Sequence, residues 1–261
     1  MKKVLIALAS VIAVALFVGV AGFFIFKSTK PLSTVVIDTS GLPQSGYIEH
    51  AKYYDITTNY ATSTPLLALG VPSDATAIAS MKKFVSDTIS QFKSDGNFAN
   101  LTPTDVATLG FSSDHKESLE IRYLIASSPH TVSYLFTVYE NTFGAHPNTY
   151  FRTFTFDTTA GAELSLADLF ISNASYLEKL SEISRRSLPD VIGGEVDAAF
   201  KKNFIDPGTT PNAKNFANFF FDNQDFVILF APYAVAPYSA GPQTLRIPVS
   251  ELASLLKPEY R

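Results

Sequence analysis

The residues best suited to chemistry in this sequence are its four histidines, because the chain contains no cysteine. Without cysteine there is no disulfide framework, no cysteine nucleophile and no cysteine-ligated zinc or iron–sulfur site. None of the histidines has a second histidine three or four residues away, the spacing that forms a metal pair on a helix. They stand far apart, at His50, His115, His130 and His146.

The sequence also lacks the short motifs of common active sites. It contains no Gly-x-Ser-x-Gly elbow, no His-Glu-x-x-His zinc motif and no glycine-rich phosphate loop. Carboxylates are plentiful, but a glycosidase pair is defined by a scaffold and not by sequence spacing. We therefore expect a protein that is not an enzyme, with no catalytic residue, no metal and no cofactor.

One histidine lies in a short segment with several unusual residue types. Residues 144–148 read Gly-Ala-His-Pro-Asn between two predicted strands. Gly144 permits a backbone shape closed to other residues, and the proline biases His146 towards an extended conformation. Three interpretations stay open: a strand connection in which His146 and Asn148 bond nearby backbone, a loop that contacts a ligand or partner, and a metal site.

A second segment is rich in proline and tyrosine. Residues 231–238 contain the triplet Ala-Pro-Tyr twice, five residues apart. Proline interrupts sheet pairing, so we expect an ordered loop after the preceding strand. Tyrosine offers rigid apolar area and a hydroxyl, which suits an interface as well as the edge of a core. The candidate binding residues of the two segments are Gly144, His146, Asn148, Tyr233, Pro237 and Tyr238.

The elements that position these segments follow from hydrophobic periodicity. Alternation of apolar residues predicts consecutive strands, and apolar residues on one helical face predict helices. The fold class expected is α+β, with antiparallel sheets and helices packed on one face. The predicted strands are 47–60, 118–126, 131–142, 149–156, 216–221, 226–230 and 244–249, and the predicted helices are 73–93, 165–170, 173–188, 196–204 and 250–256.

The amino terminus has a different character. Residues 4–26 form an uncharged run of 23 residues, long enough for one helix to cross a bilayer core of about 30 Å. The run ends in Phe-Phe-Ile-Phe-Lys, a poor cleavage site, although a cleaved signal peptide stays the alternative. The predicted organisation is an anchor over 1–30, a linker over 31–46 and two α+β lobes over 47–160 and 161–261. We expect a single-pass protein of the cell membrane, with the lobes outside the cytoplasm.

The charge of the chain changes when the predicted anchor is considered separately. The formal net charge is −4, too small for the basic face typical of nucleic-acid binding. Residues 1–30 hold four lysines and no acid, which leaves 16 basic and 24 acidic side chains and a net charge of −8. An acidic domain attracts basic partners over a long range.

The two segments, together with the motifs around them, resemble a known family. This is the extracytoplasmic domain family shared by the anti-sigma factor RsiV and the N-terminal region of the peptidoglycan deacetylase PdaC, and the resemblance runs from about residue 47 to 256. The residues that carry it are the Gly-Ala-His-Pro-Asn of 144–148, the Phe-Thr-Phe-Asp of 154–157 with Gly161, the Leu-Ser-Leu-Ala-Asp-Leu-Phe of 164–170, the strand residues 219–230, the Pro-Tyr-Ala-Val-Ala-Pro-Tyr-Ser-Ala-Gly of 232–241, and Ile247-Pro248.

The resemblance implies an α+β domain that binds lysozyme in RsiV and accompanies a separate zinc-dependent deacetylase domain in PdaC. Only three residues precede the apolar run, and the chain ends a few residues after the last motif. We therefore expect neither sigma-factor control nor deacetylation. The function expected is binding or sensing of a lysozyme-type hydrolase, as a basic protein, or of a peptidoglycan fragment. The alternatives are an envelope hydrolase that uses His146 and a non-catalytic assembly partner of another membrane protein.

Overall fold

The structure is a computed structural model that describes residues 44–61 and 74–261. The predicted membrane anchor, nearly all of the predicted linker and the chain between the second strand and the first described helix lie outside the described residues. Within the described ranges, no helix combines the length and the apolar character needed to cross a membrane.

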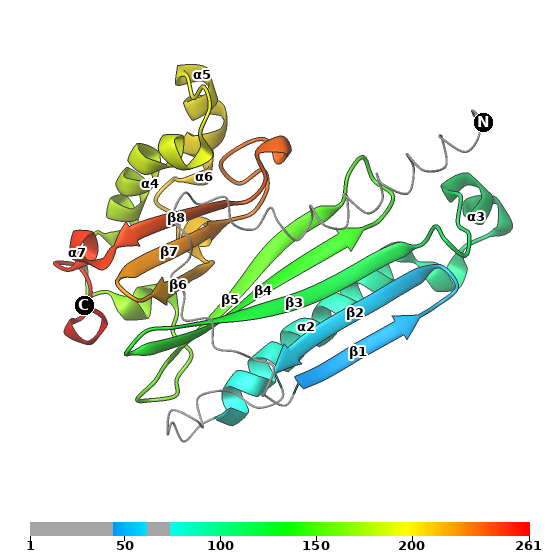
Figure 1. Cartoon of the computed structure of the whole chain (residues 1–261), viewed down its shortest axis with the longest axis horizontal. Helices are drawn as coiled ribbons and strands as arrows, with labels where there is room; N and C mark the ends of the chain where they lie inside the picture. The colour runs from blue at the N-terminus through cyan, green and yellow to red at the C-terminus, as the bar shows by residue number, and fades with distance from the viewer. Residues whose placement is uncertain (1–43, 62–73) are drawn as a thin grey trace, which may run out of the picture.

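The N-terminal half forms a five-stranded sheet in the order β1-β2-β3-β4-β5 (Figure 1). The β3–β4 and β4–β5 pairs are antiparallel hairpins, as predicted, whereas β2 and β3 are parallel. Parallel neighbours need a crossover, and helix α2 supplies it. The bounds are β1 (Gln44–His50), β2 (Tyr54–Ala61), α2 (Asp74–Gly96), α3 (Pro103–Leu109), β3 (Glu117–Ser127), β4 (Thr131–Asn141) and β5 (Asn148–Asp157).

The single strand predicted over 47–60 is wrong, because β1 and β2 are two antiparallel strands joined by a tight turn. The amide of Ala51 donates to the carbonyl of Tyr54 at 2.9 Å and closes this turn. The turn contains no glycine, proline or asparagine, so the usual sequence signals for a turn are missing. Helix α3 was not predicted either, although Thr102 and Asp105 form a capping box at its start.

One face of the five-stranded sheet packs against α2. The alternate residues of β3 and β4 that point to this face are fully buried, for example Ile121 and Phe136, and they contact Met81 and Val85 of the helix. Period-two alternation in the strands and a 3.6-residue period in the helix produce matching apolar surfaces. This core is the one that the sequence pattern predicts.

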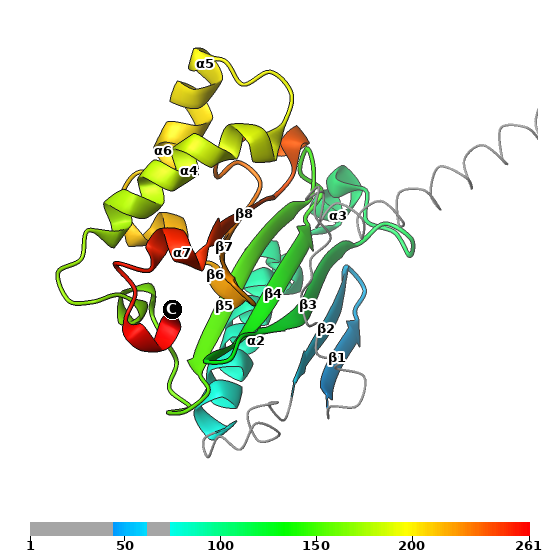
Figure 2. The same ribbon diagram turned by 60° about the vertical axis from the view of Figure 1, so that its left-hand side comes forward.

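The C-terminal half forms a three-stranded antiparallel sheet, β6-β7-β8, with helices on its outer face (Figure 2). Pro189 lies inside helix α4 (Tyr176–Ile192) without ending it, so this helix extends beyond the predicted end at residue 188.

The strand predicted over 216–221 starts later, at Phe219, because the 3₁₀ turn η6 precedes it. The bounds are η4 (Leu166–Leu169), α4 (Tyr176–Ile192), α5 (Ala198–Phe200), η5 (Lys201–Ile205), α6 (Asp206–Gly208), η6 (Ala213–Phe216), β6 (Phe219–Asp222), β7 (Asp225–Phe230), η7 (Tyr238–Ala240), β8 (Gln243–Pro248), α7 (Val249–Leu252) and η8 (Pro258–Tyr260).

The two sheets pack face to face, which gives four layers in the order helix, sheet, sheet, helix (Figures 1 and 2). Leu135 and Phe151 of the large sheet contact Phe220, Val227 and Leu229 of the small sheet. Alternating antiparallel strands commonly have one face buried and one in solvent, but the centre of the large sheet differs. Residues 131–136 of β4 are buried on both faces, because the second sheet covers the face opposite α2.

Threonine hydroxyls of β5 bond to the backbone of β6, the edge strand of the small sheet. The amide of Phe219 donates to Thr153 Oγ1 at 3.1 Å, and Thr155 Oγ1 donates to the carbonyl of Phe219 at 3.2 Å. Thr155 also shares a hydrogen bond of 2.9 Å with Ser133. All of these side chains are buried, so the bonds satisfy polar groups that water does not reach.

We predict that Thr155→Val lowers the free energy of unfolding by about 1–3 kcal/mol, because valine keeps the shape and removes the hydroxyl that serves Phe219. Urea unfolding followed by circular dichroism measures the change. Thr149→Val is the matched control on the same strand; Thr149 is half-buried, and the structure gives its side chain no hydrogen bond within the described residues. Equal stabilities of the two variants would contradict the role given to Thr155.

Candidate functional site

The structure brings together the two segments that the sequence singled out. The connection between β4 and β5 and the loop between β7 and β8 lie side by side. The imidazole of His146 stacks on the ring of Tyr238, with centroids 3.7 Å apart and planes at 18°. Its Nε2 lies 2.8 Å from the hydroxyl of Tyr233. We call His146, Tyr233 and Tyr238 the aromatic cluster.

One side of the aromatic cluster is held by hydrogen bonds, and the other side is exposed to solvent. The hydroxyl of Tyr238 donates to the carbonyl of Pro147 at 2.9 Å, and the same carbonyl lies 3.0 Å from His146 Nδ1. Tyr233 leaves 60% of its surface exposed and takes a left-handed backbone with φ of 69°. For a residue other than glycine this backbone is uncommon. The exposed ring of Tyr233 lies beside His146. The result is an exposed aromatic surface with a rigid base.

Close packing beneath the β7–β8 loop holds the tyrosines in place. Val235 and Ala236 are buried, and Val235 belongs to the core under α4. The backbone of Gly208, at the end of α6, approaches the same loop so closely that a Cβ atom there would overlap the carbonyl of Ala234. Glycine is therefore required at this position by contact, and not by its φ.

The β4–β5 connection is held from its other side by a second stack. Phe143 takes a left-handed backbone with φ of 58°, and its ring lies flat on His115 with centroids 3.9 Å apart. Phe111 packs against the ring of Phe143 as well, with centroids 5.1 Å apart. Gly144 does not use the backbone freedom that glycine permits: the left-handed residue of this connection is Phe143, and Gly144 has no close contact that requires glycine.

The other predicted binding residues lie outside the aromatic cluster. Asn148 is exposed at the start of β5 opposite Glu140. Pro237 precedes the 3₁₀ turn η7, and its carbonyl accepts the amide of Ala240. The sequence missed Tyr139 of β4, which lies near Tyr238 and whose pKa burial raises, with a smaller contribution from Tyr238. Its place in an alternating strand gave no sign of this contact.

The chemistry that this arrangement offers is stacking and hydrogen bonding. Among the described residues, the nitrogens of His146 meet a tyrosine hydroxyl and a backbone carbonyl, and no carboxylate bonds to the ring. A general base is usually oriented by such a carboxylate. In the same described ranges, no three histidine or acidic side chains gather in a way that would hold a metal ion.

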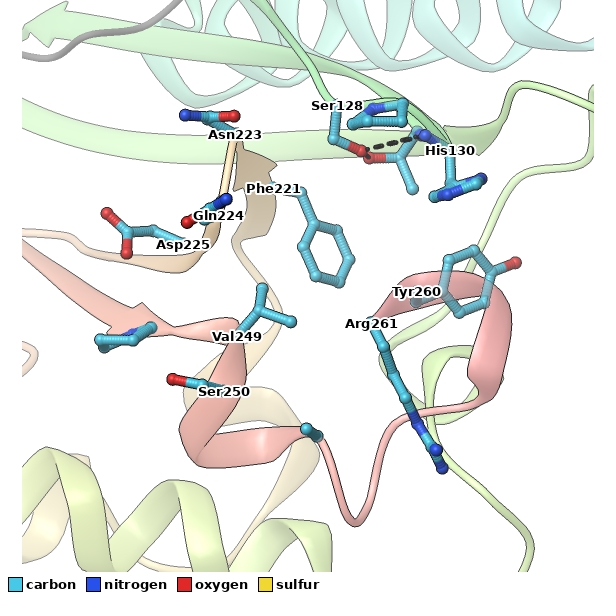
Figure 3. Close-up of a pocket in the computed structure, with 14 residues that line it drawn as sticks. Ser128, His130, Phe221, Asn223, Gln224, Asp225, Val249, Ser250, Tyr260 and Arg261 are labelled. Atoms are coloured by element: carbon cyan, nitrogen blue, oxygen red, sulfur yellow. Dashed lines mark hydrogen bonds between the residues drawn. The ribbon is translucent and has the colours of Figure 1, made fainter.

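A cavity of about 490 Å³ lies at the opposite ends of the strands (Figure 3). The β3–β4 turn, the β6–β7 turn, α7 and the end of the chain border it, and its lining includes His130, Phe221, Gln224 and Ser250. The sequence did not single out this cavity. Its lining residues come from four separate segments, and no local pattern unites them.

The carboxyl group with the most strongly lowered pKa, that of Glu49, belongs to neither the aromatic cluster nor the cavity. Hydrogen bonds from Lys93, Tyr47 and Tyr54 lower the pKa of Glu49 to about 2. Lys93 belongs to α2 and Glu49 to β1, so this ion pair at 2.6 Å fastens the edge strand to the helix. We assign the shift to this structural contact.

Comparison with known proteins finds a family match within the C-terminal half. Residues 167–250 match DUF3298, described as a protein of unknown function. Two solved structures share the fold: a DUF3298 family protein of Pseudomonas aeruginosa has a TM-score of 0.54 at 18% identity, covering 84% of this chain and 96% of that one. A DUF3298 member of Bacteroides fragilis has a TM-score of 0.52 at 16% identity, covering 85% and 96%.

Curated relatives extend the similarity beyond the family match. The chain is 29% identical to the peptidoglycan-N-acetylmuramic acid deacetylase PdaC of Bacillus subtilis over 252 residues, which is 95% of this chain and 50% of that protein. It is 25% identical to the immunogenic protein MPT64 of Mycobacterium tuberculosis over 126 residues, 48% of this chain and 52% of the relative. The chain thus spans about half the length of the curated relatives it matches.

We predict that Gly208→Ala shifts the proton NMR signals of the His146 imidazole, because the added methyl group pushes the backbone at Ala234 and moves the tyrosine loop. The free energy of unfolding should fall by about 1–3 kcal/mol. Gly193→Ala is the matched control: Gly193 has φ of 71°, and a Cβ there meets nothing within 4 Å. It should cost about 1–2 kcal/mol through backbone strain and leave the His146 signals in place. Unchanged His146 signals in Gly208→Ala would contradict this positioning role.

Proposed function

We propose that this chain, which matches DUF3298 over residues 167–250 and is 29% identical to PdaC, is a non-catalytic extracytoplasmic binding domain. The proposed binding surface is the aromatic cluster. The observation that carries the proposal is the stack of His146 on Tyr238 with the exposed ring of Tyr233 beside it. Exposed, rigid aromatic rings with polar tips are typical of recognition surfaces.

The ligand we propose is the glycan strand of a peptidoglycan fragment. A sugar ring has an apolar face of C–H groups that packs against an aromatic ring, and hydroxyl groups around its edge. Tyr233 offers an aromatic face together with a hydroxyl, and the neighbouring imidazole offers a further hydrogen-bonding group. The printed name of PdaC concerns N-acetylmuramic acid of peptidoglycan, and a shared ligand chemistry would agree with this relationship.

A second candidate ligand is a basic protein such as a lysozyme-type hydrolase. The observation that favours it is the charge of the chain after residue 30, a net −8. The resemblance to RsiV points in the same direction. Electrostatic attraction of this kind acts mainly on the association rate and weakens as salt is added.

The two non-binding alternatives predict different results. An envelope hydrolase that uses His146 would release glycan products, and these would disappear in His146→Ala. An assembly partner of another membrane protein would bind neither glycan nor lysozyme. The arrangement around His146 supports the binding proposal more directly, because its ring is held by stacking and by a tyrosine hydroxyl.

We predict that Tyr233→Ala weakens binding of a peptidoglycan tetrasaccharide at least tenfold, because it removes the exposed stacking ring. Isothermal titration calorimetry of the full-length chain measures the dissociation constant. Tyr233→Phe keeps the ring and should lose only a few-fold, through the hydroxyl. Leu109→Ala, at an exposed apolar residue of α3, is the control for a general surface effect.

The outcomes of this titration separate the candidates. Salt-sensitive binding of lysozyme without glycan binding would show that the ligand is a basic protein and not a glycan. Glycan cleavage that requires His146 would show that the protein is a hydrolase and not a binding domain. The absence of binding to both ligands would leave the binding proposal without support and favour an assembly role.

We further propose that residues 4–26 cross the cell membrane once and hold the described part of the chain outside the cytoplasm. The lack of cysteine permits a direct test, since one introduced cysteine is the only thiol. Ser172 is exposed, so Ser172→Cys in intact cells should react with a membrane-impermeant maleimide. Lys3→Cys, on the opposite side of the apolar run, should react only after permeabilisation. The reverse labelling pattern would exclude this topology.

A further inference from the structure

The cavity described above lies at the end of the molecule opposite the aromatic cluster. Strand β4 runs from the turn that borders the cavity to the connection that carries His146. Its 11 residues span roughly 35 Å at about 3.3 Å each. The cavity is therefore a separate place on the protein, and no ligand at the aromatic cluster fills it.

The cavity has an apolar floor. Phe221 of β6, Val249 and Ala253 line it, and the ring of Tyr260 stacks near Phe221 with centroids 6.4 Å apart (Figure 3). The hydroxyl of Tyr260 is used elsewhere, because it donates to Asp157 at 2.8 Å. A volume of about 490 Å³ lies within the roughly 300–1,000 Å³ typical of small-molecule sites.

Exposed polar side chains stand around this floor. Within the described part of the chain, the side chains of Asn223, Gln224 and Ser250 and the ring of His130 line the cavity, are exposed, and have no hydrogen bond within the protein. Two charged side chains also line the cavity, and both have partners: Asp225 is paired with Arg246 at 2.9 Å, and Arg261 Nε donates to the carbonyl of Leu256 at 3.0 Å. Two amides, a hydroxyl and an imidazole offer both donors and acceptors, and none of them requires a charged ligand.

The hairpin turns hold these groups firmly. The carbonyl of Gln224 accepts the amide of Val249 at 2.8 Å, which ties the β6–β7 turn to the start of α7. Across the cavity, the amide of Ser128 donates to the carbonyl of Thr131 at 2.8 Å, and the amide of Thr158 donates to the carbonyl of His130 at 3.0 Å. These bonds fix the backbone of the turns that carry the polar side chains of the lining.

We propose that this cavity binds a short peptide with small side chains. Side-chain amides pair with peptide amides through both a donor and an acceptor, and the apolar floor accommodates methyl-sized side chains. A simple anion would use neither the floor nor the acceptors. The site is distinct from the glycan surface of the proposed function and does not depend on it.

The test is a calorimetric titration of the full-length chain with tri-alanine. Tri-alanine with both peptide nitrogens methylated has the same charges without the peptide N–H donors, and should bind about tenfold more weakly. Acetate and inorganic phosphate at matched ionic strength should not compete. The Tyr233→Ala variant should bind tri-alanine like the parent chain, so a failure of the glycan proposal does not affect this result.

Variants locate the peptide in the cavity. Ser250→Tyr fills it and should weaken tri-alanine binding at least tenfold, and Gln224→Ala should weaken it several-fold. Ser254→Tyr is the matched control, because Ser254 is exposed nearby and does not line the cavity. Thermal unfolding of the two tyrosine variants shows whether both remain folded.

The proposal is overturned by any of three results. One is the absence of tri-alanine binding at about 5 mM. Another is equal binding of the methylated peptide, which would show that the peptide N–H groups are not recognised, or competition by acetate, which would make the cavity a site for small anions. The third is equal loss of binding in Ser250→Tyr and Ser254→Tyr, which would place the peptide elsewhere.

Discussion

The contact between the two sheets determines the rest of this structure. β6 is an edge strand whose backbone would be buried without partners, and Thr153 and Thr155 of β5 supply the bonds that its Phe219 needs. Around these bonds, the apolar side chains of both sheets exclude water. Buried polar groups are costly when unsatisfied, so the hydrogen bonds fix one position of the small sheet on the large one.

That position decides which loops meet. With the sheets in this register, the β4–β5 connection and the β7–β8 loop leave the same end of the molecule, where His146 reaches Tyr238. The β3–β4 and β6–β7 turns leave the other end and border the cavity. A single packing arrangement therefore creates two surfaces of different chemistry, one an exposed set of aromatic rings and the other a hollow with amide side chains.

The matches to known proteins cover different parts of the chain. The shared fold with two DUF3298 structures covers 84% and 85% of this chain, whereas the family match itself covers residues 167–250. That stretch includes α4, the small sheet and the tyrosine loop, but His146 lies outside it. The proposed binding surface thus depends on both halves of the chain, and neither half carries it alone.

The sequence by itself determined the features that depend on near neighbours. Strands β3 to β5 and helix α2 agree with their predicted bounds within a few residues, because side-chain alternation and helical periodicity are local properties. The α+β class and both candidate segments followed from the same kind of local pattern. Only the tertiary structure decided the parallel pairing of β2 with β3, the burial of both faces of β4, the meeting of His146 with Tyr233 and Tyr238, and the cavity. Each of these joins residues far apart in the chain, and the free energy that selects them comes from packing and hydrogen bonds between distant strands, helices and loops, which no short stretch of sequence contains.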